Sequence, residues 1–322
     1  MDLARVVVVG SFNVDHVWTV ASLPRPGETL SGHYRTGPGG KGFNQATAAA
    51  RAGAATTFVC ALGDDLGGQL ARALAAADGI ALHDLPSEAP TGTAGIYVDH
   101  DGRNSIVIGP GANAELTAQF VQTQRSVIAQ ARVLLAQLES PLPAVEAAFE
   151  AARAAGVNTV FNLAPADATV PASLLALADV ITPNETEFCA QMERHVGERA
   201  DASTLAAQDD GTLHALCRRL LPHGSVVITL GAAGCFVSHA DHRRHRDARS
   251  CYRVEAAHVR PVDTTGAGDA FNGALSASWA RRPDAAFAEH LHYANRFAAL
   301  STERAGAAAS LPHDAEVGAR FG

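Results

Sequence analysis

The segment DTTGAGDAFNGAL, at residues 263–275, combines a flexible turn, a carboxylate and the start of a helix. The apolar stretch AFNGALSASWA follows directly, so Gly266, Ala267 and Gly268 would lie at a helix N-terminus with unpaired backbone N–H groups. Such groups and the helix dipole both favour a bound anion. Asp269, in the first turn, either complements the dipole or takes a proton from a hydroxyl while the anion hole holds charge. Phosphoryl transfer needs that pair of functions.

A second glycine-rich segment, GPGGKGFNQATAAARAG, also leads into an expected helix. Its glycines let the backbone approach a ligand closely, and Lys41 and Asn44 add hydrogen-bond donors. The spacing is neither GxGxxG nor GxxxxGK[ST], which disfavours a dinucleotide-binding fold and a P-loop. Taken alone, the segment is also compatible with a tight turn between a strand and a helix.

The composition indicates a folded chain with a large core and an acidic surface. The sequence has 322 residues, 47% of them hydrophobic, and a net charge of −8 from 25 Lys and Arg against 33 Asp and Glu. This balance argues against a nucleic-acid partner, because a nucleic-acid-binding protein would show a basic stripe on its surface. Five scattered cysteines without a CxxC pair indicate neither a zinc site nor a disulfide framework. The apolar run in MDLARVVVVG is too short for a signal peptide or a membrane span, so we expect a cytoplasmic protein with no membrane partner.

Short apolar, β-branched runs alternate with alanine-rich stretches, a pattern that predicts βαβ units in an α/β fold. The expected strands of this mostly parallel sheet are RVVVVGS, TTFVCALG, ARVLLAQLE, TVFNLAP, DVITPN and SVVITLG. Ligands of such sheets bind beyond the carboxyl ends of the strands. The polar residues that collect at those ends are Asn13, Asp15, Glu139, Asn184, Glu187 and Thr229.

Two segments break this alternation. HVWTVASLPRPGETLSGHYRTG is typical of an antiparallel pair, and TGTAGIYVDHDGRNSIVIG of a hairpin, so together they predict a small sheet standing off the main one. The segment HADHRRHRDARS contains His239, His242 and His245, whose spacing suits no helical pair of metal ligands. We expect it to be an exposed polar turn between strands.

These motifs together resemble the pfkB-type carbohydrate kinase family. GGKGFNQA is similar to the family's N-terminal sugar-binding signature, and DTTGAGDAFNGAL to its C-terminal catalytic signature. The segments that follow in the family's order and spacing are GSFNVDHV, LPRPGET, LGDD, TGTAGIYV, GANAEL, QLESP, TPNETE, ITLGAAG and ERAGAAASLP. The resemblance implies one ribokinase-like domain over residues 1–322. It would be a three-layer sandwich, with helices on both faces of a mostly parallel sheet and a small β lid whose strands lie roughly within 16–38 and 92–109.

The resemblance also implies how a sugar is bound and phosphorylated. Asp269 matches the family's general base, which takes the proton of a sugar primary hydroxyl as that hydroxyl attacks the γ-phosphate of ATP. Gly266, Ala267 and Gly268 match the anion hole. The sugar-binding positions, besides Asp269, are Asn13, Asp15, Gly39, Gly40, Lys41, Asn44 and Glu139. This set implies phosphorylation of D-ribose to ribose 5-phosphate, with fructose, deoxyribose or a nucleoside as the alternative substrates.

The same resemblance implies positions for ATP and two cations. Glu187 of the NxxE element would order Mg²⁺ partly through water, whereas without the resemblance it reads as an ordinary acid at a helix N-terminus. The ATP-binding positions are Asn184, Thr229, Gly231, Gly234, Gly268 and Asn295. A potassium activator would be held mostly by backbone carbonyls of Asp263, Thr265, Ser301, Arg304, Gly306 and Ser310.

The sequence departs from the family pattern near the expected sugar pocket. Phe43 stands where alanine is usual, NLAPA replaces NPAPA, and the loop Ile108 to Gly111 lacks the usual histidine. Phe43 and this loop could reshape the pocket, so they leave the exact sugar open but not the chemistry. A non-catalytic sugar or nucleotide sensor is an alternative, but it would be expected to lose Asp269 or the anion hole. A Rossmann oxidoreductase would need a fingerprint that is missing here. The family also implies a lid that excludes water and makes a homodimer interface.

Overall fold

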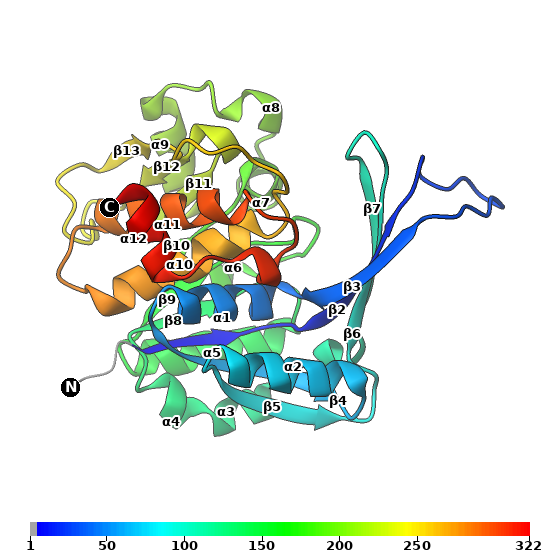
Figure 1. Ribbon diagram of the computed structural model, residues 1–322. Helices are drawn as coiled ribbons and strands as arrows, with labels where there is room; N and C mark the ends of the chain where they lie inside the picture. The colour runs from blue at the N-terminus through cyan, green and yellow to red at the C-terminus, as the bar shows by residue number, and fades with distance from the viewer. Residues whose placement is uncertain (1–4) are drawn as a thin grey trace.

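The computed structural model describes residues 5–322 and consists of a large α/β body with a smaller sheet that projects from it (Figure 1). Residues 1–4 of the expected domain lie outside the described residues. The nine strands of the main sheet, in spatial order, are β13 (Cys251–Val254), β12 (Cys235–Ser238), β11 (Ser225–Thr229), β10 (Val180–Ile181), β9 (Asn158–Phe161), β8 (Val133–Ala136), β1 (Arg5–Val9), β4 (Ala55–Gly63) and β5 (Ala81–Ser87). Only β12 runs against the others, so the expected mostly parallel sheet is confirmed.

Helices cover both faces of this sheet because its strands are apolar on both sides. In β1, Val6 and Val8 point into one core and Val7 and Val9 into the other, and all four side chains are fully buried. The helices over the first face are α1 (Lys41–Arg51), α2 (Leu66–Ala77), α10 (Ala267–Arg281), α11 (Phe287–Ser301) and α12 (Asp314–Phe321). Those over the second are α3 (Ala118–Thr123), α4 (Arg125–Ile128), α5 (Leu142–Ala154), α6 (Ala172–Leu175), α7 (Glu185–Val196), α8 (Ala202–Leu205) and α9 (Asp210–Leu220).

The projecting sheet, which we call the lid, comes from the two segments that broke the sequence pattern. Its spatial order is β3 (His33–Gly39), β2 (Asn13–Thr19), β6 (Gly92–Val98) and β7 (Asn104–Gly109). β2 pairs antiparallel with β3 and parallel with β6, and β6 forms a hairpin with β7. Because β2 begins four residues after β1 ends, the base of the lid lies at the carboxyl edge of the main sheet.

The histidine-containing segment was predicted wrongly in part. His242 is exposed, but His239 is fully buried, with Nδ1 2.7 Å from Ser225 Oγ and Nε2 3.0 Å from Asp247 Oδ2. His245 packs on Phe287, and burial lowers its pKa to about 4. Tertiary packing therefore anchors this segment to the body, although its composition is that of a solvated loop.

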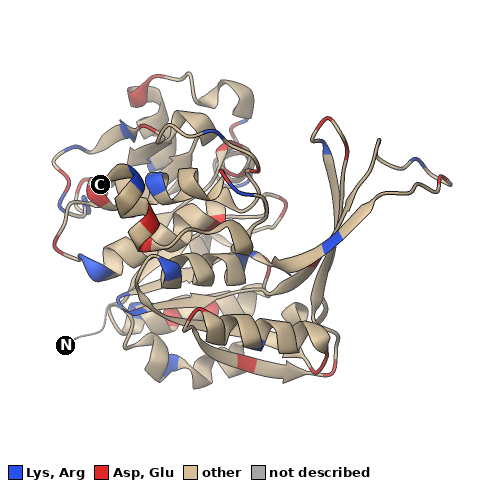
Figure 2. Cartoon of the chain, viewed as in Figure 1, with Lys and Arg blue, Asp and Glu red and all other residues tan. Residues whose placement is uncertain are grey.

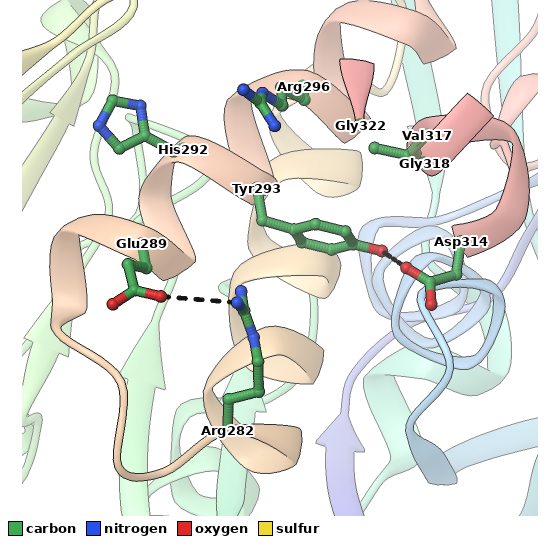
Figure 3. A pocket seen from close by; sticks show the side chains of 9 residues that line it. All are labelled: Arg282, Glu289, His292, Tyr293, Arg296, Asp314, Val317, Gly318 and Gly322. Atoms are coloured by element: carbon green, nitrogen blue, oxygen red, sulfur yellow. Dashed lines mark hydrogen bonds and ion pairs between the residues drawn. The ribbon is translucent and has the colours of Figure 1, made fainter. Parts of the chain in front are cut away.

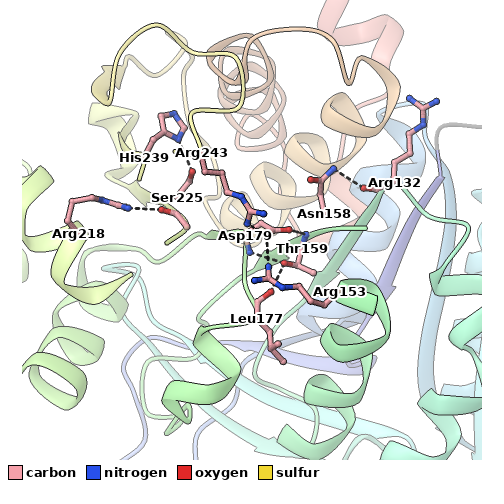
Figure 4. A network of polar contacts seen from close by, with 11 residues as sticks. Arg132, Arg153, Asn158, Thr159, Leu177, Asp179, Arg218, Ser225, His239 and Arg243 are labelled. Carbon is pink, nitrogen blue, oxygen red and sulfur yellow. Dashed lines mark hydrogen bonds and ion pairs between the residues drawn. The ribbon is translucent and has the colours of Figure 1, made fainter. Parts of the chain in front are cut away.

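A buried carboxylate provides a second anchor for that segment (Figure 4). Asp179 forms ion pairs with Arg243 of the segment and with Arg153 of α5, the latter at 3.0 Å. It also accepts the backbone N–H of Thr159 at 2.9 Å. The segment is thus fixed on the body at the edge remote from the lid.

Charged side chains of both signs are interspersed over the helices and loops of the body (Figure 2). No helix among residues 5–322 is both long and apolar enough to cross a membrane.

Candidate active site

The first element of the site is the N-terminus of α1, which abuts the end of β1. Gly40 precedes the helix with φ of 86°, a conformation that favours glycine. A Cβ atom on Gly42 would overlap the backbone of Gly10 and Ser11, so only glycine allows this approach. Ser11 Oγ donates to Glu139 Oε2 at 2.6 Å, and the Lys41 N–H donates to the same oxygen at 3.0 Å. Glu139, which follows β8, is thereby held at the carboxyl edge.

The base of the lid contributes the next two predicted side chains, Asn13 and Asp15. They lie on the same face of β2, two residues apart, and a Cβ atom on Gly39 of β3 would overlap the Asp15 carboxylate. Asn113 Nδ2 donates to Asn13 Oδ1 at 2.8 Å and to the Phe12 carbonyl at 2.9 Å. The Asn13 amide is thus oriented by a buried asparagine on the short 3₁₀ helix Gly111–Glu115.

Asp269, in the first turn of α10, lies across from α1. Asn44 Nδ2 donates to its Oδ2 at 2.9 Å, and Gln45 Nε2 donates to its Oδ1 at 2.8 Å. The Asp269 side chain is only 6% exposed. Burial raises the pKa of Asp269, although Lys41, Asn44 and Gln45 all favour the ionised form. A carboxylate of raised basicity that two amides hold in place is suited to accept a proton.

A cavity of about 190 Å³ opens at the N-terminus of α10 beside Asp269. Gly266, with φ of 76°, turns the chain into the helix. Open space surrounds Gly268 on the side where a side chain would lie, because a Cβ atom there would meet no other atom within 4 Å. The Ala267 N–H donates to the Thr264 carbonyl at 3.2 Å, whereas the N–H groups of Gly266, Gly268 and Asp269 have no acceptor among residues 5–322. These free donors and the helix dipole make the cavity suitable for an anion.

The opposite wall of this cavity is the N-terminus of α7. Asn184 and Glu187 form a capping box, in which each side chain accepts the other's backbone N–H at 2.8 and 2.9 Å. Glu187 therefore acts as a helix cap, as its position in the sequence allowed, and it also lines the cavity with Thr229 and Lys41.

One carboxylate in this wall fits a magnesium ion that keeps its waters and is bound mainly by phosphates. Within residues 5–322 no three His, Cys, Asp or Glu side chains gather closely enough to cage a metal directly. Burial raises the pKa of Glu187, against the effects of the Asn184 N–H and Lys41, so a cation near it would favour the ionised form.

A second cavity, of about 310 Å³, adjoins the first, since Thr264 and Ala267 line both. Its walls are mostly apolar, with Gly231 on one side and Asn295 of α11 on another. Asn295 Nδ2 donates to the carbonyls of Val254 and Glu255 at 3.3 and 3.2 Å, which fixes this wall. Gly234 makes the turn possible, because a Cβ there would overlap the Val254 carbonyl oxygen. A flat heterocycle would fit here with its phosphates in the first cavity.

The positions expected at the cation site come from two segments that lie together beside α10. Asp263 Oδ1 accepts the Thr265 N–H and its Oδ2 accepts the Gly306 N–H, both at 2.9 Å. Ser301 and Ser310 are buried here, each 2% exposed. The side chain of Arg304 turns away to pair with Glu316, so only its backbone is available. Carbonyl, hydroxyl and carboxylate oxygens at this junction fit a monovalent cation.

Four carboxylates and one ammonium dominate the electrostatics around the predicted sugar-binding positions. Burial, together with Glu139 and Asp269, raises the pKa of Asp15 to about 6. Burial alone would lower the pKa of Lys41, but Asp269, Glu139 and Glu187 outweigh it and the pKa rises. Lys41 is therefore charged and lies between the carboxylates and the anion cavity.

The side chain of Phe43 lies in the core and not in a cavity, so it would alter the sugar pocket only through the position of α1. Its ring is 1% exposed and packs edge-on to Phe12 and Phe58, with centroids 5.1 and 6.0 Å away, inside the core between α1 and the sheet. The Ile108 to Gly111 loop lies at the end of β7, and Ile108 is 47% exposed.

Several polar residues of the site were missed from the sequence. Gln45, Gln137, Asn162 and Asn113 are all buried within the hydrogen-bond network of Asp269 and Asn13. All four lie inside segments that the sequence analysis singled out, namely GGKGFNQA, QLESP, NLAPA and GANAEL, and this was the available signal.

A larger cavity, of about 570 Å³, lies between the end of α10, α11 and α12 (Figure 3). Tyr293 donates to Asp314 there at 2.6 Å, and Arg282 faces Glu289 at 3.6 Å. None of the predicted site residues lines it, and Asp314 is also paired with Arg281 outside the cavity.

Known proteins are similar to this chain in sequence and in fold. A family model described as pfkB family carbohydrate kinase matches residues 3–314. The ribokinase of Haemophilus influenzae is 38% identical over 310 residues, 95% of this chain and 94% of that protein. The solved structure of the ribokinase of Thermotoga maritima has a TM-score of 0.85 at 30% identity. The solved structure of the ribokinase of Arabidopsis thaliana, complexed with ribose and ATP, has a TM-score of 0.80 at 29% identity. Both comparisons cover 98% of this chain and 98% of the other.

Proposed function

The chain belongs to the pfkB family of carbohydrate kinases, and from this premise we propose that it phosphorylates the primary hydroxyl of D-ribose with ATP. The observation that carries the proposal is the convergence of a buried carboxylate, Asp269, with a helix N-terminus that offers free N–H groups. Relatives of 38% identity that are ribokinases support ribose as the sugar.

In the proposed reaction the sugar lies between the base of the lid and α1. Asn13 donates hydrogen bonds to its secondary hydroxyls and Asp15 accepts hydrogen bonds from them, and Glu139 and Asn44 complete the pocket with Gly39, Gly40 and the Lys41 backbone. A neutral polyol needs such paired acceptors and donors, because it offers no charge for recognition.

Asp269 takes the proton of the primary hydroxyl as its oxygen attacks the γ-phosphorus, and ADP leaves with the electrons of the broken P–O bond. The N–H groups of Gly266, Ala267 and Gly268 and the Lys41 ammonium stabilise the charge on the transferred phosphoryl group. Ala267 would exchange its 3.2 Å bond to Thr264 for the phosphate. The adenine occupies the second cavity between Gly231 and Asn295, with Gly234 shaping the turn.

Two cations complete the proposal. Magnesium would neutralise the phosphates beside Glu187, Asn184 and Thr229, and potassium would be held at Asp263, Thr265, Ser301, Arg304, Gly306 and Ser310. The second site adjoins the start of α10, so an occupied site would stabilise the anion hole. The need for ATP leads us to expect the enzyme in the cytoplasm.

We further propose that two copies of the chain associate through their lids. The exposed side chains of β7 include Ile106, Val107 and Ile108, at 51%, 68% and 47%, and β7 is an edge strand. An apolar edge of this kind needs a partner to avoid aggregation. A second copy offers the same surface and closes the pair by two-fold symmetry.

A sugar panel tests the proposed function. The protein is incubated with Mg-ATP and potassium, and ADP release is followed with ribose, deoxyribose, fructose, a nucleoside and no sugar. We expect the highest kcat/KM with ribose; a higher value for another sugar would replace ribose and keep the kinase. No sugar-dependent ADP release would favour a sensor role.

A further inference from the structure

A chain of buried amides runs beneath the Asp269 carboxylate. Gln137 Nε2 donates to Gln45 Oε1 at 2.5 Å, and Gln45 Nε2 donates both to Asp269 Oδ1 at 2.8 Å and to Asn162 Oδ1 at 3.0 Å. Asn162 passes the chain on to the Thr182 carbonyl at 3.0 Å. Gln45 and Gln137 are 0% and 1% exposed, so water does not compete for these bonds.

The bonding pattern fixes which way the Gln45 amide points. Its oxygen is taken by Gln137, and its two N–H groups are taken by Asp269 and Asn162. If the Gln45 amide were flipped, its oxygen would face the Asp269 carboxylate and its nitrogen would face Gln137 Nε2. Two acceptors and two donors would then face each other, so the flipped orientation is disfavoured at both positions. The side chain of Gln137 is itself confined, because it packs closely against the backbone of Gly10: a Cβ atom added there would overlap Gln137 Oε1.

We propose that Gln45 and Gln137 are positioning residues for the phosphoryl transfer, with Gln137 orienting the Gln45 amide and Gln45 orienting the Asp269 carboxylate and stabilising its ionised form. A buried donor to a carboxylate favours ionisation more strongly than an exposed one. Burying amides costs free energy, and hydrogen bonds offset this cost only in part here, because Gln137 Oε1 has no partner among residues 5–322. Apolar residues would therefore pack here more simply if the network had only a structural role.

The inference rests on the proposed function of Asp269 as the base. The charged groups that face Asp269 from the surrounding elements are Lys41 of α1, Glu139 after β8, Glu187 of α7 and Asp15 of β2. All four remain in the variants below, so a change in the titration of Asp269 reports on the amides.

The test compares Gln45→Met and Gln137→Met with Gln191→Met, a matched control at a fully buried glutamine of α7 whose amide has no hydrogen-bond partner within residues 5–322. For Gln45→Met we expect kcat to fall about ten- to a hundred-fold, with the KM for ribose changed less than about threefold. The acidic limb of the kcat profile should move up by about one pH unit. Gln137→Met should shift both in the same direction by less, and the control should shift neither.

A readout without turnover separates this inference from the proposed function. In protein labelled with ¹³C at aspartate carboxyls, the Asp269 signal is assigned by its loss in Asp269→Asn. Its pKa should rise in Gln45→Met whether or not the protein phosphorylates ribose. An unmoved pKa and an unmoved acidic limb in a folded Gln45→Met protein would overturn the inference. If that variant does not fold, Gln137→Met decides by the same two measurements.

Discussion

Asn44 Nδ2 lies 2.9 Å from Asp269 Oδ2, although 225 residues separate the two in the chain. The bond joins the first turn of α1, which directly follows Gly39 and Gly40, to the first turn of α10, which borders the anion cavity. The two helix N-termini, on which the proposed sugar and phosphate sites depend, are thereby joined directly.

Asp269→Asn should abolish most turnover while the site stays intact. The amide keeps the shape of the carboxylate but cannot accept a proton, so kcat should fall about 10²- to 10⁴-fold, with ribose and ATP binding retained. Steady-state kinetics and calorimetric titration measure the two effects. Retained kcat would remove Asp269 from the role of general base.

Gly273→Ala should weaken the contact between α1 and α10. A Cβ atom at Gly273 would overlap the Gln45 carbonyl oxygen and the Ala48 Cβ, so the two helices must separate. We expect the free energy of unfolding to fall by about 1–3 kcal/mol and kcat to fall with it, because the bond from Asn44 to Asp269 spans this contact. Urea unfolding and kinetics check this.

The matched control is Gly318→Ala on α12, where an added Cβ meets nothing within 4 Å. Alanine there should raise stability slightly and leave kcat unchanged. Equal effects of the two substitutions would contradict the close-contact explanation.

Asp15→Asn should stabilise the protein at neutral pH while weakening ribose binding. The folded-state pKa of about 6 exceeds the ordinary value of 3.8, so the folded protein holds this proton more tightly than the unfolded chain does. Its stabilising contribution is complete below pH 3.8 and is lost as the pH rises through 6. At pH 8 the ionised side chain therefore lowers the free energy of unfolding by about 3 kcal/mol.

Thermal unfolding of the wild type and Asp15→Asn between pH 4 and pH 8 measures this effect. The variant should have the higher Tm at pH 8, and the difference should vanish near pH 4. A difference that is independent of pH would show that the substitution acts by packing. In the wild type, the affinity for ribose should fall as the pH drops below 6, since a protonated Asp15 loses acceptor capacity.

The sequence predicts most of the sheet and the residues at its carboxyl edge, because buried parallel strands have a strong local signal and the two glycine-rich motifs are contiguous. The sequence did not reveal Asn113, Gln137 or Asn162, because each is bonded to a residue about a hundred positions away in the chain. Asn113 bonds to Asn13, and Gln137 and Asn162 both bond to Gln45, whose own role was not predicted. The burial of Phe43 and of His239 was not predicted, because side-chain burial depends on tertiary packing, which a local pattern does not specify.

Potassium should activate the enzyme through the segment that leads into α10. The Asp263 carboxylate is held ionised by the N–H groups of Gly306 and Thr265, which lower its pKa in spite of burial. Replacing potassium by tetramethylammonium at constant ionic strength should lower kcat about tenfold, because the carbonyls around the site would repel one another and loosen the anion hole. Equal rates in both salts would refute the cation site.

Val107→Glu should dissociate the proposed dimer. Val107 is 68% exposed on the edge strand β7, on the lid face that carries Trp18 and Tyr34. In a symmetric interface this carboxylate would lose its water and would lie near the same carboxylate of the second copy. The desolvation cost and the charge repulsion both oppose association. Light scattering should give twice the chain mass for the wild type and the single mass for the variant. Gln208→Glu, which adds the same charge at an exposed position on the body, should remain dimeric. A wild-type chain that is monomeric at working concentration would contradict association through the lid.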